Sequence, residues 1–532
     1  MRMVKGSIIF MVLLLQFLPL SAQFPGTLDP SFGDTGVVLL DHNYNSQNNA
    51  ILGSAIQADG KLVFGGWSYG PDASGYNFIR LMPDGEVDEN FGIDGVVVIN
   101  PGGTNDYISD VAIQQDGKIL GIGNSNDMVY SKTVVIRLNP DGTLDNGFGI
   151  NGIVDIDLGP LSNVFGFALF IQDDGKILTV GDISSLPEYE FIMCRLNPDG
   201  SFDHTFGDTG IIINGIPNKI DHINSIGIQN EKIIVGGTSY DENWNGSITI
   251  YQYLMDGILD TQFGNGGIAI RDIHTQLQLA EYSGKVCLSQ DGKIIYAGYV
   301  NGIQDNHFAV LRFLSDGSID NSFGDEGISV TEIDGDAKAL GVVVQSDGKI
   351  IAGGYRAFDY NADFTLVRYM PNGDLDTSFG TNGTGIVIQN LSDSVSVMED
   401  KIKTLALQTD GKLIAAGYAY TESGIIDFAA ARYFADIGAV IESPHKSQFN
   451  FSTHPNPFTH KTTLEFTLDS RSDVAIEVYD NRGIRVGTIA NQSFDQGEHQ
   501  LRWNSDGMPA GVYIIKMTVG DMIYTKKVVK SP

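Results

Sequence analysis

The chain has few cysteines and, after its first 23 residues, no long hydrophobic run. Its two cysteines, Cys194 and Cys287, are too few for a disulfide framework in 532 residues, so both are expected as buried free thiols. No later segment approaches the length that spans a bilayer, so no transmembrane segment is predicted in the mature chain. Gly-x-Ser-x-Gly, HExxH, phosphate-loop and dinucleotide motifs are also absent, which leaves no signature of the enzyme classes that they mark.

Positive charge is scarce as well. Lysine and arginine total 33 against 65 aspartates and glutamates, so the net charge is −32. Such a surface repels nucleic acid and anionic membranes through long-range Coulomb forces, and no nucleic-acid partner is expected. Cations or neutral sugars are the easier partners for the surface as a whole.

The N-terminus reads "MRMVKGSIIFMVLLLQFLPLSAQ". Arg2 and Lys5 precede an apolar run that ends in small residues, a pattern typical of a secretory signal peptide over residues 1–22. An N-terminal membrane anchor is the alternative, and the shortness of the run favours the signal peptide.

Glycine is abundant, with 64 copies, and much of it falls in a repeat. The lysine of an Asp-Gly-Lys turn returns every 56 to 63 residues, at Lys61, Lys118, Lys176, Lys232, Lys293, Lys349 and Lys412. A phenylalanine keeps the same rhythm at Phe32, Phe91, Phe148, Phe206, Phe263, Phe323 and Phe379. An arginine recurs with the same period at Arg80, Arg137, Arg195, Arg312, Arg368 and Arg432, and Gln252 takes its place in the fourth unit. The sequence therefore contains seven structural units.

Each unit predicts four short strands. In the unit over residues 95–149, "GVVVIN", "ISDVAIQ", "KILGIGN" and "TVVIRLNP" alternate or are rich in β-branched residues, and Asp116-Gly117 suits a tight hairpin turn with positive φ values. Seven such antiparallel sheets predict an all-β, seven-bladed β-propeller over residues 23–436. A parallel β-helix fits worse, because its coils need no hairpin turn in each unit.

The two ends of the array are complementary. The chain enters with "LDPSFGDTGVVLL", the last part of a unit, and leaves with "FAAARYFADIG", which lacks that part. We therefore expect the N-terminal strand to complete the last blade and close the ring. Glycines after the lysine, such as Gly65 and Gly66, are expected where strands crowd near a central axis.

"LNPDGTLDNGFGINGIV" and "AIQQDGKIL" resemble the delta-60 repeat of bacterial secreted β-propellers, over roughly residues 28–436. The resemblance supports the fold and transfers no catalytic residues. The fourth unit departs from it with "IQNEKIIVGG", where Asn230 predicts a tightened hairpin. A lysine at the same turn of every blade is interpreted as scaffold, since a ring needs at most one active site.

Function is expected on the variable-loop face, which carries the loops "WSYGPDASGYN", "GDISSLPEYE", "TSYDENWNG" and "YRAFDYNAD". Aromatic residues there suit stacking on sugar rings, and we take as candidate ligand contacts Tyr69, Tyr76, Tyr240, Trp244, Tyr355, Tyr360 and Tyr420. The alternative is that these rings only pack loops onto blades. A second candidate is a polar cluster for metal or acid–base chemistry, formed by Asp221, His222, Asp272 and His274.

The propeller is thus predicted to be a noncatalytic binding or adhesion module for a glycan or an extracellular protein. An extracellular enzyme acting on polysaccharide, with its site on the variable-loop face, is the alternative. No catalytic residue, cofactor or metal ligand is assigned. Calcium in the Asp- and Asn-rich loops stays open, although no DxDxDG sequence provides the ligand spacing.

The repeat stops after Asp436, and residues 437–448 form a linker. Residues 449–532 predict a small immunoglobulin-like β-sandwich and closely resemble the type A sorting domain of the type IX secretion system. The resemblance rests on short motifs at Pro455-Asn456-Pro457-Phe458, Val478-Tyr479-Asp480, Gly511-Val512-Tyr513 and Lys526-Lys527. It implies the type IX machinery as a partner. It also implies a secreted or outer-membrane surface location in a Gram-negative bacterium, reached through the periplasm.

Overall fold

The computed structural model describes residues 24–436 and 451–531, apart from segments 41–47, 70–74, 128–129, 160–161, 186–187, 208, 273–283, 303–304, 359–360, 392–398, 421–424, 469–470, 481–484, 510 and 520–521. The chain divides into two compact units, Met1–Ile437 and Gly438–Pro532. The signal peptide predicted at 1–22 and the linker predicted at 437–448 lie outside the described residues. The described residues contain no helix, and so no helical segment with the length and apolarity to cross a bilayer.

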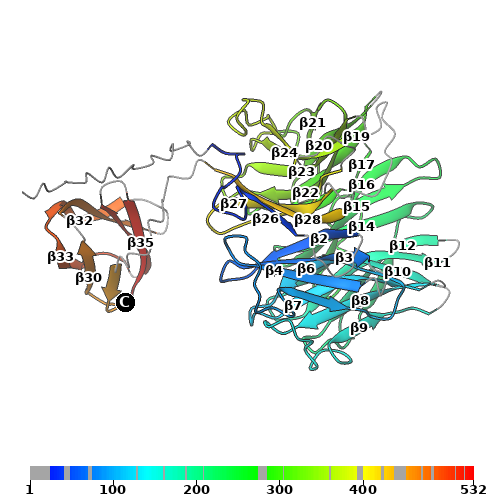
Figure 1. The fold of residues 1–532 in the computed structure, drawn as a ribbon, viewed down its shortest axis with the longest axis horizontal. Helices are drawn as coiled ribbons and strands as arrows, with labels where there is room; N and C mark the ends of the chain where they lie inside the picture. Colours follow the sequence, from blue (N-terminus) through cyan, green and yellow to red (C-terminus); the bar gives the residue numbers. More distant parts are fainter. Residues whose placement is uncertain are drawn as a thin grey trace, which may run out of the picture. The chain divides into compact units, whose positions relative to one another are not determined.

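Seven four-stranded antiparallel blades form the first unit, and a single parallel bridge, Asn48↔Ile426, joins the first blade to the seventh (Figure 1). The first four blades are β2 (Asn48–Ile56), β3 (Leu62–Tyr69), β4 (Gly75–Leu81) and β5 (Val96–Ile99); β6 (Asn105–Ile113), β7 (Ile119–Asn126), β8 (Ser131–Leu138) and β9 (Ile153–Ile156); β10 (Asn163–Ile171), β11 (Ile177–Ser185), β12 (Glu188–Leu196) and β13 (Ile211–Asn214); β14 (Ile220–Gln229), β15 (Lys232–Tyr240), β16 (Gly246–Leu254) and β17 (Ile268–Asp272).

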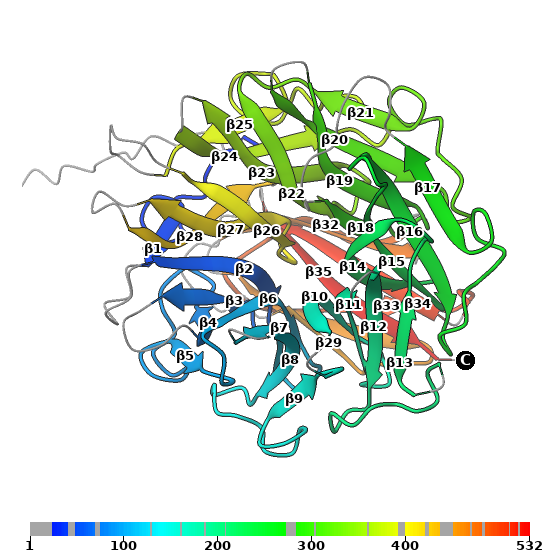
Figure 2. The same ribbon diagram turned by 90° about the vertical axis from the view of Figure 1, so that its right-hand side faces the viewer.

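The other three blades are β18 (Lys285–Leu288), β19 (Ile294–Asn301), β20 (Asn306–Phe313) and β21 (Ile328–Thr331); β22 (Asp336–Val344), β23 (Ile350–Phe358), β24 (Asn361–Tyr369) and β25 (Ile386–Gln389); and β26 (Lys401–Leu407), β27 (Lys412–Tyr420) and β28 (Ile426–Phe434) with β1 (Val37–Leu40). The first strand of each blade lies nearest the common axis and the last lies at the rim (Figure 2). The predicted seven-bladed β-propeller is confirmed.

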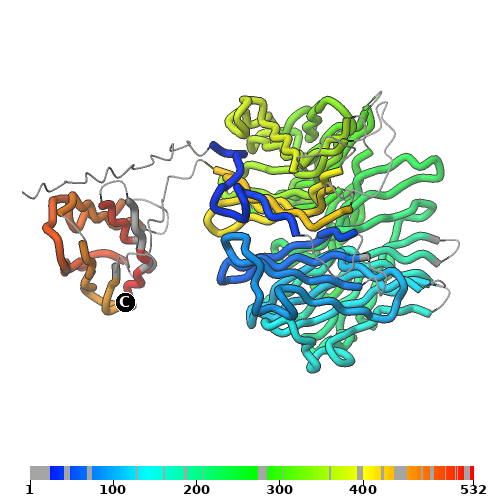
Figure 3. The backbone as a smooth tube through the Cα atoms, in the orientation of Figure 1, coloured from blue at the N-terminus to red at the C-terminus, as the bar shows by residue number. Residues whose placement is uncertain are grey.

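The ring closes through the N-terminal strand. β1 pairs antiparallel with β28, in register Val38↔Ala430, and so supplies the outer strand of the seventh blade. Figure 3 shows the dark blue N-terminal segment beside the last propeller strands. Asp29, just ahead of β1, accepts a hydrogen bond from Arg432 Nε at 2.8 Å and lies 3.1 Å from Lys412 Nζ. The predicted closure therefore joins parts of the chain that lie about 400 positions apart in sequence.

The Asp-Gly-Lys turn differs in detail from the prediction. In the second blade the Gly117 N–H donates to the Gln114 carbonyl at 2.9 Å, and Gly117 alone takes a positive φ, of 84°. Asp116 keeps a negative φ, and its Oδ1 accepts the Lys118 N–H at 3.2 Å. The turn is therefore a type I turn followed by a left-handed glycine, not a two-residue hairpin.

The fourth blade does have the two-residue hairpin. Asn230 and Glu231 take φ values of 51° and 57°, and Gln229 pairs directly with Lys232. Two consecutive left-handed residues fit the twist of the flanking strands. The tightened hairpin predicted at Asn230 is present.

A buried arginine ties six of the blades to the next one. In the second blade Arg137 Nε donates to Asp145 Oδ2 at 2.8 Å, and its guanidinium lies 4.5 Å from the centre of the Phe148 ring. Its Nη1 donates to the Pro198 carbonyl in the third blade. Lys118 Nζ adds a contact of 3.1 Å to Asp145. The three repeated residues of the sequence are thus one structural unit, and the lysine belongs to it.

The repeated glycines lie in the second strand from the axis. Gly66 is in β3, the second strand of its blade, and a Cβ there would lie 1.8 Å from the Ala50 carbonyl oxygen of the innermost strand. Gly123 meets the Tyr107 carbonyl in the same way at 1.9 Å. Close backbone approach is the reason for glycine, but a bulge in the innermost strand causes it.

The second unit has two sheets, one of β29 (Phe451–His454), β30 (Lys461–Leu468) and β33 (Gly497–Asn504), the other of β32 (Arg485–Phe494), β31 (Ser472–Asp480), β34 (Gly511–Val519) and β35 (Met522–Lys530). Both contribute to one core, through Leu464 and Phe466 of the first sheet and Val474, Ile476 and Ile515 of the second. The unit is a small β-sandwich.

Candidate functional site

The central channel is lined by one structural position in every blade. In six innermost strands the pairing with the second strand skips one residue, which forms a bulge. The skipped residues are Leu52, Ser109, Phe167, Asn224, Leu340 and Lys403, and all six line a single cavity. In the fifth blade, Gly284 and Lys285 at the start of β18 line it. The fold therefore places side chains of differing chemistry from all seven blades around one axial space.

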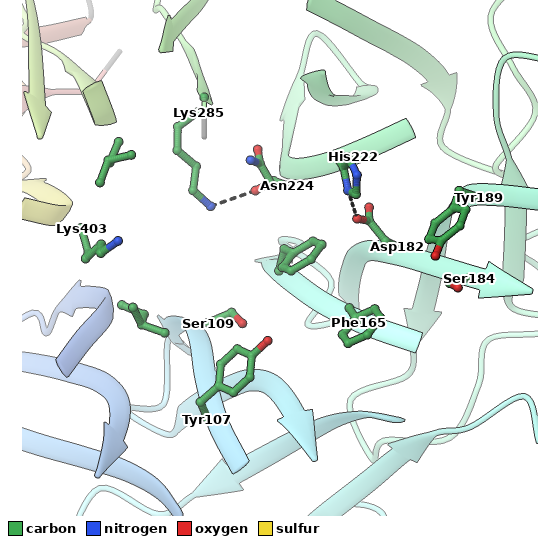
Figure 4. A pocket seen from close by; sticks show the side chains of 14 residues that line it. Tyr107, Ser109, Phe165, Asp182, Ser184, Tyr189, His222, Asn224, Lys285 and Lys403 are labelled. Carbon is green, nitrogen blue, oxygen red and sulfur yellow. Dashed lines mark hydrogen bonds and ion pairs between the residues drawn. The ribbon is translucent and has the colours of Figure 1, made fainter. Parts of the chain in front are cut away.

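This channel cavity has a volume of about 490 Å³ (Figure 4). Beyond the ring of bulged residues, blades two to four contribute further walls: Tyr107, Phe165, Asp182, Ser184, Tyr189 and His222. Tyr107, Phe165 and His222 precede the bulges in strands that end at the lysine hairpins, so the cavity lies toward the opposite, variable-loop face. Its volume and its mixed apolar and polar lining are typical of small-molecule sites.

A histidine–aspartate pair forms one side of the cavity. Nδ1–H of His222 donates to Oδ2 of Asp182, and the Ile223 N–H donates to Oδ1 of the same carboxylate at 3.2 Å. Burial raises the pKa of Asp182, although the bond from His222 opposes that effect. The edge of the Tyr240 ring packs 5.8 Å from the imidazole centre. This pair could hold or transfer a proton at the cavity wall.

Two lysines face the same cavity. Lys285 Nζ donates to the Asn224 carbonyl at 2.9 Å, and Lys403 Nζ lies 5.8 Å from the centre of the Tyr418 ring. Burial lowers the pKa of Lys285, and burial together with the charge of Lys401 lowers the pKa of Lys403 to about 8. Among the described residues neither ammonium forms an ion pair.

The aromatic residues predicted as ligand contacts are not gathered in this cavity. Tyr76 is fully buried and its hydroxyl donates to the Val134 carbonyl at 3.4 Å, while Tyr240 is buried beside His222. Trp244 is 57% exposed, in a turn where its φ is 62°. Tyr355 and Tyr420 are half-buried. Tyr360 lies outside the described residues, and of Tyr69 only the backbone, at the end of β3, is described.

Of the three members of the predicted polar cluster that the structure describes, His222 alone lines the cavity. Asp221 is buried on the opposite side of β14, where its Oδ2 accepts the Tyr251 hydroxyl at 3.0 Å, because successive residues of a strand face opposite ways. Asp272 is exposed and accepts the Ser247 hydroxyl at 2.5 Å. His274 lies outside the described residues. The grouping of His222 with Asp221 was wrong in geometry, since its carboxylate partner is Asp182 of the neighbouring blade.

Sequence reasoning missed most of the cavity: Tyr107, Phe165, Phe167, Asp182, Lys285 and Lys403. A signal for part of it exists in "DYISDV", "VFGFAL" and "HINSIG", where equivalent positions differ from repeat to repeat within strands. The bulge makes those positions face the axis, and an unbulged alternation does not reveal it. Among the described residues, no three His, Cys, Asp or Glu side chains are placed to hold a metal ion.

In the C-terminal unit the Pro-Asn-Pro-Phe motif holds the last strand. Asn456 Oδ1 accepts the Val529 N–H at 2.8 Å, the Phe458 N–H donates to the Val529 carbonyl at 2.9 Å, and the Ser531 N–H donates to the Phe458 carbonyl at 2.7 Å. The Phe458 ring packs on Trp503 with centroids 5.4 Å apart. The two ends of the sorting-domain resemblance are therefore neighbours in space.

The other motif residues lie in the last two strands. Gly511 begins β34, Tyr513 is buried in it, and Lys526 of β35 is exposed. The side chains of Val512 and Lys527 are outside the description.

Comparison with known sequences identifies both units. The DUF5122 domain, a domain of unknown function described as a beta-propeller, matches residues 57–91, 114–148, 172–206, 229–263, 289–323, 345–379 and 408–436. A secretion system C-terminal sorting domain matches residues 452–531. This domain marks the chain for type IX export to the cell surface or the medium of a Gram-negative bacterium. No curated protein matches the chain.

Several solved structures match the chain at low identity. A polysaccharide lyase, Uly1, is 11% identical, with 78% of this chain and 98% of the lyase covered and a TM-score of 0.45. PorZ, a surface component of the type IX secretion system of Porphyromonas gingivalis, is 8% identical, with coverage of 93% and 100% and a TM-score of 0.18. A Bombyx mori GH32 beta-fructofuranosidase is 9% identical, with coverage of 76% and 92% and a TM-score of 0.28. These likenesses carry no argument about ligand or activity.

Proposed function

From the premise that this chain is a DUF5122 β-propeller protein with a secretion sorting domain, we propose that its propeller is a binding module for a saccharide. The end of the saccharide enters the channel cavity from the variable-loop face. Export brings the propeller to the cell surface or the medium, where saccharide chains are accessible.

The observation that carries the proposal is the composition of the cavity wall. Rings of Tyr107, Phe165 and Tyr189 offer apolar faces for sugar C–H groups, and the hydroxyls of Ser109 and Ser184 offer hydrogen bonds. The second and third blades supply these groups from a scaffold that every blade repeats, and side chains that differ between repeats on a shared scaffold are the pattern expected of a site rather than of packing.

The test is a glycan array probed with the full-length chain, followed by calorimetric titration of the saccharides that bind. Phe167→Ala removes an aromatic wall of the cavity and is expected to weaken binding by about tenfold or more. Trp244→Ala is the matched control, because this ring is exposed on a loop outside the cavity. Binding that Trp244→Ala abolishes and Phe167→Ala leaves intact would place the ligand on the loops and refute the proposal.

An extracellular enzyme acting on polysaccharide is the second candidate, and the His222–Asp182 pair favours it, since a paired histidine can transfer protons. Incubation with the bound polysaccharide, followed by chromatography of the products, separates the two functions. An enzyme yields shorter products, and His222→Gln is expected to abolish them while the dissociation constant changes little. A binding module yields none with either chain.

A further inference from the structure

We infer that the saccharide is anionic, and that Lys285 and Lys403 hold its carboxylate or sulfate groups in the channel cavity. This inference rests on the proposed function and names the class of ligand. The net charge of the whole chain, −32, would instead favour cations or neutral sugars as ligands. The local charge in the cavity decides the matter, because recognition occurs at contact distance.

The two lysines differ from the repeated lysines of the scaffold. Every lysine of the seven hairpin turns has a carboxylate within 4.0 Å, as with Lys61 and Asp88 at 3.0 Å. Lys285 and Lys403 form no ion pair in the described part of the chain, although acidic residues outnumber basic ones about twofold. Both lysines are half-buried and line one cavity, so an anion from outside is the partner that these two cations can take.

The nearby carboxylates are engaged elsewhere. Asp182 accepts hydrogen bonds from His222 and the Ile223 N–H. Glu399, whose charge raises the pKa of Lys403 against the effect of burial, lies 2.7 Å from Lys401 Nζ. Asp110, which lines an adjoining cavity with both lysines and attracts Lys285, accepts the Leu169 N–H of the next blade at 3.1 Å and the Val111 N–H of its own strand at 2.9 Å. None of these groups fills the space in front of the two ammonium groups.

The lysines also retain donors for a ligand. Lys285 uses one of its three N–H groups on the Asn224 carbonyl and keeps two. Gly284 precedes it, and a Cβ there would lie 1.9 Å from the Tyr296 hydroxyl, so a side chain at this place would displace the Tyr296 ring. Burial lowers the pKa of both lysines, and a bound anion reverses that cost. Aromatic walls beside cations suit a sugar ring that carries an acid group.

Calorimetric titration of the full-length chain tests the inference with three probes: trigalacturonate, a sulfated galactose trisaccharide and neutral galactotriose. We expect one or both acidic probes to bind at least tenfold more tightly than the neutral one, and their ratio distinguishes carboxylate from sulfate. Lys403→Met keeps the side-chain length and should remove this preference. Lys132→Met is the control, because Lys132 lies away from the cavity and pairs with Asp155 at 2.7 Å.

The outcomes separate this inference from the proposed function. Equal binding of acidic and neutral probes, unchanged by Lys403→Met, overturns the inference and leaves the saccharide-binding module standing. If no trisaccharide binds, a second measurement decides whether the cavity holds an anion at Lys403. Acetylation of this lysine is measured by mass spectrometry in the presence and in the absence of sulfate. Protection by sulfate supports the anion site and refutes the saccharide. Equal acetylation refutes both.

Discussion

The buried arginine found in six blades makes three kinds of contact at once, and it shows how single residues hold the propeller together. Arg137 bonds to Asp145, covers Phe148 and reaches the Pro198 carbonyl of the next blade. The same three kinds of contact recur in five further blades. A guanidinium suits this position because its planar donors fix direction as well as distance.

Arg137→Met is expected to lower the stability of the propeller by about 2 kcal/mol or more, because the Pro198 carbonyl and part of the Asp145 carboxylate lose their partner inside the protein. The fall in melting temperature, followed by circular dichroism, measures the effect. Lys132→Met, which removes an exposed ion pair, should change it by less than about 1 kcal/mol. Equal effects of the two substitutions would contradict the structural role of the arginine.

Lys403 gives the channel cavity a predicted pH dependence. Its ammonium is near Lys401, Glu399 and the Tyr418 ring, and it shares the cavity with Lys285 and the His222–Asp182 pair. A lysine is cationic below its pKa, and the pKa of this one is lowered to about 8. Affinity for an acidic saccharide should therefore fall about tenfold from pH 7 to pH 9, where carboxylates and sulfates stay ionised. Titrations at both pH values measure it, and Lys403→Met should lose most of this dependence.

At this scale the sequence predicted the scaffold better than the site. The lysine at the position of Lys118 returns every 56 to 63 residues, so its structural role could be predicted from the sequence. In the structure Lys118 contacts Asp145. Lys403 and Phe167 occur once each at their position. They reach the cavity only because a bulge turns them toward the axis and seven strands meet there.

Among the blades, the fourth lacks the arginine. Gln252 takes its place. Asp260 and Phe263 nevertheless keep the positions of the arginine's usual partners. The fifth blade also has, at residues 314–317, the loop whose carbonyl accepts the arginine in other blades. Lys232 Nζ contacts Asp260 at 3.0 Å, as the lysine does in other blades. The fourth blade therefore retains the pocket for an arginine that it does not have.

Gln252→Arg is expected to stabilise the propeller by about 1 kcal/mol, since the new guanidinium finds an aspartate, an aromatic ring and a loop carbonyl already arranged. A rise in melting temperature checks this. Gln252→Lys adds the same charge without the planar donors and serves as the control. If lysine stabilises as much as arginine, the effect is one of charge alone, and the arginine contacts of the other blades are not reproduced.

Ring closure shows what element-level reasoning can achieve. The surplus strand at one end and the missing strand at the other were readable in "GVVLL" and "FAAARYFADIG", and β1 does pair with β28. The turn type was less accessible. Asp116-Gly117 fits two kinds of hairpin, and only the strand register, Ile113↔Ile119, selects the longer one.

At the scale of the whole molecule, the two compact units have different predicted tasks: the propeller binds and the C-terminal sandwich directs export. Each has its own core, with Phe466, Ile476 and Ile515 in that of the sandwich. A unit with its own core keeps its fold when the other is removed. The sorting motif could be read from sequence because it is contiguous. Its contact with the last strand could not be, because Asn456 and Val529 lie 73 positions apart.

Removal of residues 438–532 is therefore expected to leave a folded propeller that accumulates in the periplasm, since the signal for outer-membrane export is lost and the propeller core is not. Cell fractionation locates the protein, and resistance to limited proteolysis reports its fold. Asn456→Ala, which removes the acceptor for the Val529 N–H, should reduce export in part by loosening β35. Lys403→Met, altered only in the channel cavity, should be exported normally. Release of the truncated chain into the medium at normal levels would refute the assignment of export to the sandwich, whereas its degradation would instead show that the propeller depends on the sandwich for its fold.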